Sequence, residues 1–309
     1  MNSTSALRIG TRGSPLALAQ AEETRRRLEE AFPELAGAIP IEIIQTTGDR
    51  IQDRPLSAIG GKGLFTKEID EAQLEGRVDI AVHSMKDVPT LLPDGLTLAA
   101  LLPREDVRDV LISAKGRSLA ELPAGAVVGS ASLRRAAQIL RRRPDLSVIP
   151  FRGNVQTRLR KLAEGQVDAT LLAMAGLNRL VIMPIEAVPL SVEEMLPAVA
   201  QGAIGITCRA DDARALSFLA ALDDLPTRQR VTAERAFLAV LDGSCRTPIA
   251  GLAELRDERL DFTGMILKPD GSAAYDVLAA GHAADPESLG RSAAETLLKL
   301  AGPAFLAPP

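Results

Sequence analysis

The polar residues Ser84, Lys86 and Asp87 directly follow the short apolar run Ile80–Val82. The run is short enough for a buried strand, and Pro89 stops further sheet pairing. In open α/β sheets the ligand crevice lies at the carboxyl ends of the strands, so the three side chains are expected to face a cleft. They bring a hydroxyl, an ammonium and a carboxylate, which suit ligand binding and proton transfer. The alternative is a strand followed by an ordinary polar turn.

Arginines recur where a strand is expected to pass into a helix. Helix N-termini attract anions through free N–H groups and the helix dipole, and a guanidinium fork makes such an end a carboxylate or phosphate site. A single arginine at such a position is usually just a solvated surface charge. Six arginines at comparable positions indicate instead that the protein binds a polyanionic ligand. The six are Arg12, Arg134, Arg135, Arg152, Arg158 and Arg179.

Phosphate-binding loops are excluded by spacing. A P-loop needs glycine where Leu56 stands and Ser or Thr where Gly63 follows Lys62, and no GxGxxG follows a strand. Lys62, in a glycine-rich segment, is therefore interpreted as a cationic group on a lid. A long connection of this kind is usually functional.

The remaining reactive residues are ambiguous by themselves. Cys245 follows a helix terminus, which raises a thiol pKa, and precedes Arg246, which lowers it, so its reactivity does not follow from its neighbours. A small buried side chain is the simpler interpretation of Cys245. Cys208 within a strand and His83 are both expected to be structural.

Composition limits the classes of protein. A chain of 309 residues with 46% apolar residues is expected to form two or three domains. The net charge of −4 and 3% aromatic content argue against general binding of nucleic acid or anionic membranes. Two cysteines and two histidines predict neither a disulfide framework nor a metal site. The sequence contains no recognisable signal peptide or membrane-spanning segment, so a cytoplasmic protein is expected.

An internal repeat predicts two related α/β lobes. Residues 74–85 and 163–174 both place Glu-Gly-x-Val-Asp before an apolar strand ending in Met. Ser14 and Ser132 each follow a strand and a glycine and are expected to cap a helix. Gly176 stands where the first copy has Asp87, so the carboxylate is peculiar to one lobe, as expected for one active site.

Hydrophobic periodicity, together with capping residues, Gly and Pro at the ends of segments, predicts strands and helices in alternation. The Thr47–Asp49 segment is expected to be a turn, Thr66 and Asn154 are expected to cap helices, and Gly243 to end one. The expected strands are 7–10, 41–45, 79–83, 98–102, 109–113, 127–129, 147–151, 168–173, 203–208, 249–255, 260–267 and 275–279, with helices after residues 14, 66, 132, 154 and 226 and over 286–300.

Eight motifs in this chain together resemble the porphobilinogen deaminase family, also called hydroxymethylbilane synthases. They run in family order from about Arg8 to Ala250: GTRGSPLALAQ, GGKGLF, AVHSMKDVP, GSASLRR, FRGNVQTRL, AGLNRL, QGAIGI and DGSCRTPIA.

The resemblance implies an α/β fold with two periplasmic-binding-protein-like lobes and a small C-terminal α+β domain. The expected domains are lobe one over 1–102 with a return segment at 200–220, lobe two over 103–199, and a C-terminal domain over 221–309. It implies a transferase that joins four porphobilinogen molecules head to tail, releases ammonia and hydrolyses the product to hydroxymethylbilane. The cofactor implied is dipyrromethane, attached through Cys245. A monomer with a small-molecule substrate, no nucleic acid and no membrane partner is expected.

The resemblance also implies roles for individual residues. Asp87 is the implied catalytic carboxylate, which stabilises pyrrole N–H cations and assists proton transfer. Residues implied to bind the cofactor are Cys245, Lys86, Ser84, Ser132, Arg134 and Arg135. Residues implied to bind substrate are Arg12, Ser14, Lys62, Phe65, Arg152, Arg158, Arg179 and Gln201; no metal is implied.

Three positions depart from the family pattern. Ala58 and Asn178 stand where lysines are frequent, which removes cationic contacts. Ala200 stands where glycine is common, which puts the local backbone conformation in question. The rival hypothesis is a two-lobed anion-binding protein without catalysis, which accounts for the arginines but not for the cysteine-bearing domain.

Overall fold

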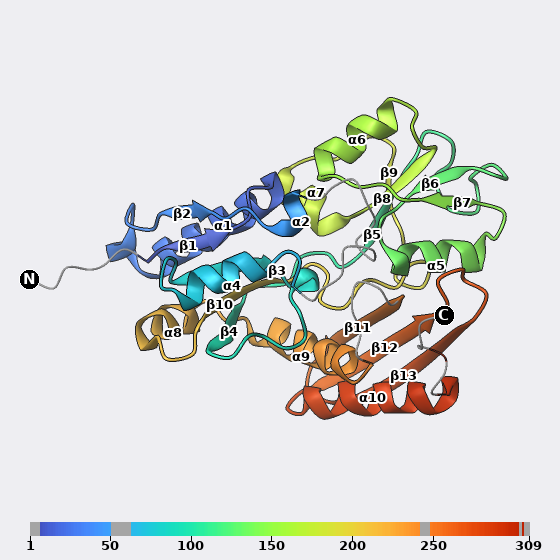
Figure 1. Ribbon diagram of the computed structural model, residues 1–309. Coiled ribbons are helices and arrows are strands. Elements are labelled where there is room, and N and C mark those ends of the chain that lie inside the picture. Colours follow the sequence, from blue (N-terminus) through green and yellow to red (C-terminus); the bar gives the residue numbers. More distant parts are fainter. Residues whose placement is uncertain (1–6, 51–62, 242–247, 303–304, 306–309) are drawn as a thin grey trace, which may run out of the picture. The chain divides into compact units, whose positions relative to one another are not determined.

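The computed structural model describes residues 7–50, 63–241, 248–302 and 305 (Figure 1). Its chain divides into two compact units. Within the described ranges, unit 1 comprises residues 7–50, 63–105 and 203–228, and unit 2 comprises residues 106–202 and 229–305. The boundary falls inside helix α9 (Leu225–Val240).

Unit 1 contains a five-stranded mixed sheet with the strand order β2-β1-β3-β10-β4. The pairs β2-β1 and β1-β3 are parallel, whereas β10 runs antiparallel to β3 and β4 on either side of it. Residues far apart in sequence therefore complete one sheet. The strands are β1 (Ile9–Thr11), β2 (Ile41–Ile43), β3 (Ile80–Ser84), β4 (Leu96–Leu101) and β10 (Ile204–Arg209).

The helices of unit 1 begin where the sequence supplies caps. Ser14 accepts a hydrogen bond from the Ala17 N–H at 3.2 Å, and Pro15 occupies the first position of α1. Thr66 occupies the N-cap of α4, but its side chain makes no capping bond. Besides α9, the helical elements are α1 (Pro15–Ala31), η1 (Pro33–Leu35), α2 (Thr47–Arg50), α4 (Lys67–Leu74), η2 (Met85–Asp87) and α8 (Ala213–Ala220).

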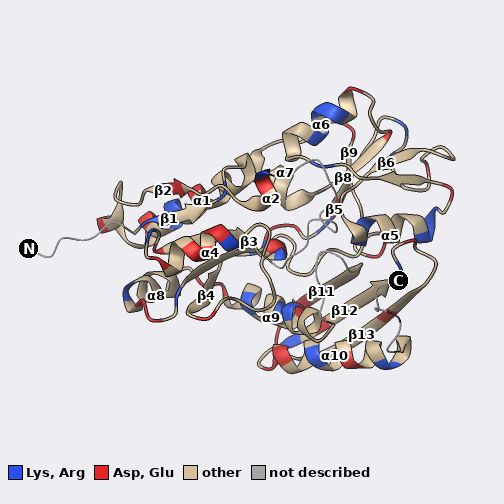
Figure 2. Cartoon of the chain, viewed as in Figure 1, with Lys and Arg blue, Asp and Glu red and all other residues tan. Residues whose placement is uncertain are grey.

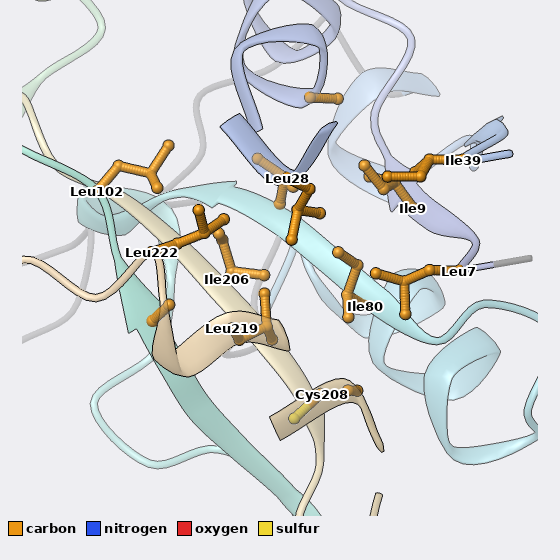
Figure 3. Packing of buried hydrophobic residues seen from close by; sticks show 14 of the residues in the cluster. Leu7, Ile9, Leu28, Ile39, Ile80, Leu102, Ile206, Cys208, Leu219 and Leu222 are labelled. Atoms are coloured by element: carbon orange, nitrogen blue, oxygen red, sulfur yellow. The ribbon is translucent and has the colours of Figure 1, made fainter. Parts of the chain in front are cut away.

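The core of unit 1 packs α1 and α8 against the sheet (Figure 3). Leu28 of α1, Ile80 of β3, Ile206 of β10 and Leu219 of α8 are all fully buried in one cluster. Cys208 belongs to this cluster, so the prediction of a structural thiol there is confirmed. The contribution of each such side chain is about 1.5–3 kcal/mol of hydrophobic free energy.

Unit 2 repeats the sheet of unit 1, with the strand order β7-β6-β8-β5-β9. Again the first two pairs are parallel, and β5 runs antiparallel to its neighbours β8 and β9. The strands are β5 (Asp109–Ile112), β6 (Val127–Gly129), β7 (Ser147–Ile149), β8 (Ala169–Ala173) and β9 (Ala187–Pro189). The helices are α5 (Leu133–Arg142), α6 (Val155–Ala163) and α7 (Met174–Leu180).

The repeated Glu-Gly-x-Val-Asp motif makes the same contact in both sheets. The Asp79 carboxylate accepts from the Arg8 N–H at 2.8 Å, and the Asp168 carboxylate accepts from the Val127 N–H at 2.7 Å. In both copies the aspartate N–H donates back to the carbonyl of the same partner. Each aspartate thus joins the start of its strand to the start of the neighbouring parallel strand, which explains its place in the repeat.

The last part of unit 2 is an α+β domain with the antiparallel sheet β11-β12-β13. Phe237 of α9 packs against Phe262 of β12 with ring centroids 4.9 Å apart. Gly290 lies against the α9 backbone, where an added Cβ would be 1.9 Å from the Ala233 carbonyl oxygen. The elements are β11 (Ile249–Arg256), β12 (Arg259–Leu267), β13 (Ala274–His282) and α10 (Pro286–Ala301).

The fold class predicted from the sequence is confirmed: two α/β lobes and a small α+β domain. Two local expectations in unit 1 are wrong. Thr66 makes no side-chain capping bond to α4, and residues 47–50 form the short helix α2 rather than a turn. The Thr47 N–H donates to Glu68 Oε1 at 2.9 Å, and this contact with α4 holds the short helix in place. Gly243, the expected helix end, lies outside the described residues.

Candidate active site

Asp87 follows strand β3 in η2 and shares an arginine with a second carboxylate. Arg12 Nη1 lies 3.8 Å from Asp87 Oδ2. Arg12 Nε donates to both carboxylate oxygens of Asp49 at 3.1–3.2 Å, and Arg12 also forms an ion pair with Asp49 through Nη2. The Phe65 ring centroid is 4.2 Å from Arg12 Cζ. These four residues are named here the Asp87 cluster.

Asp49 is the better anchored of the two carboxylates. The Thr46 hydroxyl donates to Asp49 Oδ2 at 2.7 Å. Burial alone would raise the pKa of Asp49, but hydrogen bonds from Arg12 and Thr46 lower it below the ordinary value. Asp49 is therefore ionised and fixes Arg12, whereas the Asp87 side chain is 33% exposed. The Asp87 carboxylate can thus meet a ligand.

Two serines predicted for the site have structural partners in unit 1. The Ser84 hydroxyl and the Gln20 side-chain amide exchange hydrogen bonds at 2.9 and 3.1 Å, and Ser14 caps α1. His83 is buried and lies 3.2 Å from the Thr207 hydroxyl. Burial, with a smaller effect of the Arg12 charge, lowers the pKa of His83 to about 4, so the ring is neutral at pH 7. This agrees with the expected structural histidine.

A second polar cluster lies at the carboxyl end of β8 in unit 2. Asp109 is fully buried and pairs in the sheet with Ala173, the last residue of β8. Arg134 Nη2 donates to Asp109 Oδ2 at 2.7 Å and Arg135 Nη2 donates to Oδ1 at 2.7 Å. The Gln201 amide donates to Oδ1 at 2.9 Å. Asp109, Arg134, Arg135 and Gln201 are named here the Asp109 cluster.

Both arginines of the Asp109 cluster lie in the first turn of α5, which Ser132 caps by accepting the Arg135 N–H. Figure 2 shows basic residues at both ends of this helix. The side chains of Arg134 and Arg135 are 5% and 7% exposed, and among the described residues no acceptor contacts either Nε atom. Burial alone would raise the pKa of Asp109, but the two guanidiniums keep it well below its usual range.

Two other arginines predicted for lobe two, Arg158 and Arg179, donate to backbone carbonyl groups. Arg158 Nε donates to the Gly153 carbonyl at 3.0 Å, and Arg179 Nη2 donates to the Gly202 carbonyl at 3.0 Å. Arg152 precedes α6, and its carbonyl accepts from Lys161 Nζ at 3.2 Å. Arg179 is in the last turn of α7 rather than at a helix N-terminus, so the expected dipole contribution is wrong for this residue.

The structure thus groups Arg12, Phe65 and Asp87 in unit 1, and Arg134, Arg135 and Gln201 in unit 2. Lys86, in η2 beside Asp87, is exposed. Lys62, Ala58 and Cys245 lie outside the described residues. Sequence reasoning missed Asp49 and Asp109 as partners of the arginines. For Asp109, the available signal was a carboxylate at the start of a strand that is otherwise apolar. For Asp49, it was the Thr-Gly-Asp sequence that follows the second strand.

Two kinds of site are not found in the described part of the chain. No group of three or more His, Cys, Asp or Glu side chains there could hold a metal ion. No helix among residues 7–50, 63–241 and 248–302 has the length and hydropathy to cross a membrane.

Comparison with known proteins covers nearly the whole chain. The family model for the porphobilinogen deaminase dipyromethane cofactor binding domain matches residues 7–217, and that for the porphobilinogen deaminase C-terminal domain matches residues 228–299. Porphobilinogen deaminase of Paracoccus denitrificans is 60% identical over 94% of this chain and 93% of its own. The chloroplastic porphobilinogen deaminase of Oryza sativa is 59% identical over 97% of this chain and 86% of its own.

Among solved structures, a putative methionine-binding lipoprotein from Bacillus subtilis is similar, with a TM-score of 0.45 and 11% identity. It covers 71% of this chain and 91% of its own. The two family models and the relatives at about 60% identity agree with the motifs in the sequence, and so this chain belongs to the porphobilinogen deaminase family.

Proposed function

We propose that this chain condenses four porphobilinogen molecules head to tail with release of ammonia, and then hydrolyses the linear product to hydroxymethylbilane. This reaction belongs to tetrapyrrole biosynthesis, which leads to porphyrin and haem. Membership of the porphobilinogen deaminase family supports it. The observation that carries the proposal is the Asp87 cluster, in which a partly exposed carboxylate stands 3.8 Å from an arginine that a second carboxylate anchors.

Asp87 is the proposed catalytic residue. Its carboxylate accepts hydrogen bonds from a pyrrole N–H of the substrate and stabilises the positive charge that develops on the ring. It also assists removal of the proton at the end of each condensation. The anchored Arg12 contributes a fixed cation beside it, which suits binding of a substrate carboxylate while Asp87 stays directed at the pyrrole nitrogen.

The carboxylates of the substrate are proposed to be bound by cationic and polar side chains. Each porphobilinogen carries an acetate and a propionate, and a charge-assisted hydrogen bond contributes about 1.5–3 kcal/mol, so several are needed to hold a lengthening polyanion. The proposed substrate-binding residues are Arg12, Ser14, Lys62, Phe65, Arg152, Arg158, Arg179 and Gln201.

The cofactor proposed is dipyrromethane attached through Cys245. Residues of unit 2 fit such a group, because Arg134 and Arg135 keep buried Nε–H donors without an acceptor among the described residues, and carboxylates are suitable acceptors. When bound, the group supplies the pyrrole carbon at which the chain is extended. Ser84, Lys86, Ser132, Arg134 and Arg135 are the residues proposed to hold it.

The proposed organisation has three domains, with lobe one at 1–102 and 200–220, lobe two at 103–199 and the cysteine-bearing domain at 221–309. Pairing of β10 with β3 and β4 supports the return segment. The enzyme is proposed to act in the cytoplasm as a monomer without nucleic acid or membrane partners. The net charge of −4 supports the absence of a polyanionic macromolecule as partner.

Two measurements test the function. The intact mass of the freshly purified chain is expected to exceed the polypeptide mass, and proteolysis is expected to place the excess on the peptide containing Cys245. Incubation with porphobilinogen is expected to release ammonia. If the purified chain has only the mass of the polypeptide, and binds porphobilinogen without releasing ammonia, the rival hypothesis of a non-catalytic anion-binding protein is supported instead.

A further inference from the structure

The Asp109 cluster contains more positive than negative charge. It buries two guanidinium groups and one carboxylate, with Asp109 fully buried and both arginine side chains at least nine-tenths buried. The three charged side chains therefore carry a net charge of +1. An uncompensated charge in a dry interior is strongly unfavourable, so the cluster is suited to receive one more anionic group.

The hydrogen bonds within the cluster show where that anion would bind. The Nη1 atoms of Arg134 and Arg135 donate to the carbonyl groups of Leu196 and Leu171, at 2.6 and 2.9 Å. Their Nη2 atoms donate to Asp109 at 2.7 Å. The Nε–H groups are the buried donors that remain without an acceptor among the described residues. Asp109 thus uses one end of each guanidinium and leaves the Nε edge for a further acceptor.

The sheet places Asp109 where lobe one has an apolar residue. Asp109 is paired with Ala173 at the end of β8, and in unit 1 the matching cross-strand pair at the end of β3 is Ile204 with Ser84. The arginine of lobe one, Arg12, is instead fixed by Asp49 from α2. Each lobe therefore fixes its arginines with a carboxylate, but from a different element.

We propose that Asp109 is a positioning residue that holds Arg134 and Arg135 so that their Nε–H groups bind a carboxylate of the dipyrromethane cofactor. The proposal rests on the function proposed above. Asp109 touches neither cofactor nor substrate; it acts through the two arginines. The low pKa that the guanidiniums impose on Asp109 keeps it ionised over the working range of pH, which this role needs.

Loading of the cofactor-free chain with porphobilinogen tests the proposal, with the intact mass followed over time. Asp109→Asn keeps the shape but removes the charge, and Asp109→Glu keeps the charge but moves the carboxylate. Because positioning within about 0.5 Å matters for such a site, Asp109→Asn is expected to load at least ~10-fold and Asp109→Glu at least ~3-fold more slowly than the unsubstituted chain.

Asp168→Asn is the matched control. Asp168 lies in the same unit before the start of β8, whereas the Asp109 cluster lies at the carboxyl end of that strand, and its carboxylate accepts the Val127 N–H at 2.7 Å. Its substitution is expected to lower the melting temperature while loading stays within about twofold, because its partners Val127 and Lys115 are outside the Asp109 cluster. Loading by folded Asp109→Asn and Asp109→Glu at the unsubstituted rate overturns the positioning role. Failure of the unsubstituted chain to gain mass overturns the function itself.

If both Asp109 variants fail to fold, an NMR measurement on the unsubstituted chain tests the proposal. In ¹⁵N-arginine-labelled protein, the Nε–H signals are assigned with Arg134→Lys and Arg135→Lys. On loading, these two Nε–H signals are expected to shift downfield, while the slowly exchanging Nη signals bonded to Asp109 stay in place. Unchanged Nε–H signals, or loss of the Nη signals on loading, overturn the proposal.

Discussion

Arg12 Nη1 lies 3.8 Å from Asp87 Oδ2, too far for a direct hydrogen bond but within the range of an ion pair. The same guanidinium is bonded to Asp49, so Arg12 does not depend on Asp87 for its position. Asp87 is therefore held near a fixed cation while its carboxylate oxygens remain available to a ligand.

Asp87→Asn is expected to fold normally and to lose turnover. The Arg12–Asp87 pair is partly exposed and 3.8 Å apart, so it is expected to contribute about 0–1 kcal/mol and the melting temperature changes little. Loss of the negative charge beside the pyrrole nitrogen is expected to reduce kcat by about 100-fold or more, since removal of one preorganised electrostatic group has effects of this order. Ammonia release measures it, and Asp94→Asn, an exposed aspartate of the same unit, is the control. Near-normal turnover would remove the carboxylate from the mechanism.

Asp49→Asn is expected to weaken substrate binding more than it weakens the fold. The substitution removes the charge that fixes Arg12 but keeps a partner for the Thr46 hydroxyl. The KM for porphobilinogen is expected to rise about 10-fold, since the loss of one charge-assisted bond is of that size. Asp145→Asn, which breaks the Arg143 ion pair on the surface of unit 2, is the control. Equal KM values for the two variants would contradict the anchoring role.

Asp70→Asn is expected to stabilise the protein at neutral pH. Burial raises the pKa of Asp70 to about 6, above its value in an unfolded chain. The folded state therefore holds this proton more tightly, and the stability it contributes below pH 4 is lost as the pH rises through 6. The variant is expected to be about 1–2 kcal/mol more stable at pH 7.5 and equal to the unsubstituted chain near pH 4.

Urea unfolding at both pH values measures the Asp70 effect. Asp94→Asn changes an exposed carboxylate of the same unit and is expected to leave the difference between the two pH values unaltered. A stability gain by Asp70→Asn that is the same at pH 4 and pH 7.5 would show that packing, and not the buried charge, is responsible.

Ala200→Gly is expected to raise the free energy of unfolding by about 1 kcal/mol, because Ala200 has φ +59 and a Cβ is strained in this region. The surroundings enforce this backbone: the Ala200 N–H donates to buried Glu234 at 2.6 Å. Ala203→Gly is the control; Ala203 is buried without a positive φ, and its replacement is expected to destabilise. A lower melting temperature for Ala200→Gly than for the unsubstituted chain would contradict the strain.

Local signals in the sequence predicted most of the elements, for identifiable reasons. Ser14, Ser132 and Asn154 cap the helices expected after them, because these caps act through bonds within three residues. The repeated aspartates Asp79 and Asp168 predicted the two lobes, because each secures the same strand junction. The helices α7 and α8 were not predicted; they are short and depend on packing against their sheets.

The partners of the arginines could not be predicted from the sequence. Asp109 is 25 residues from Arg134, and the sheet brings them together only because β5 inserts between β8 and β9. Asp49 is 37 residues from Arg12, and a short helix that was expected to be a turn presents it. Sequence spacing identified the arginines as a set, but which carboxylate each one meets is decided by long-range strand pairing.

The pairing of β10 sets an order for folding during synthesis on the ribosome. Strand β10 joins β3 to β4, and it is available only when residues 204–209 have emerged from the ribosome. By then all strands of the sheet β7-β6-β8-β5-β9 have been synthesised. Lobe two can therefore fold first, while the half-finished sheet of unit 1 exposes two open edges of the kind that attracts misassociation. Nascent chains stalled before residue 204 are thus expected to bind chaperones through the region around β3 and β4.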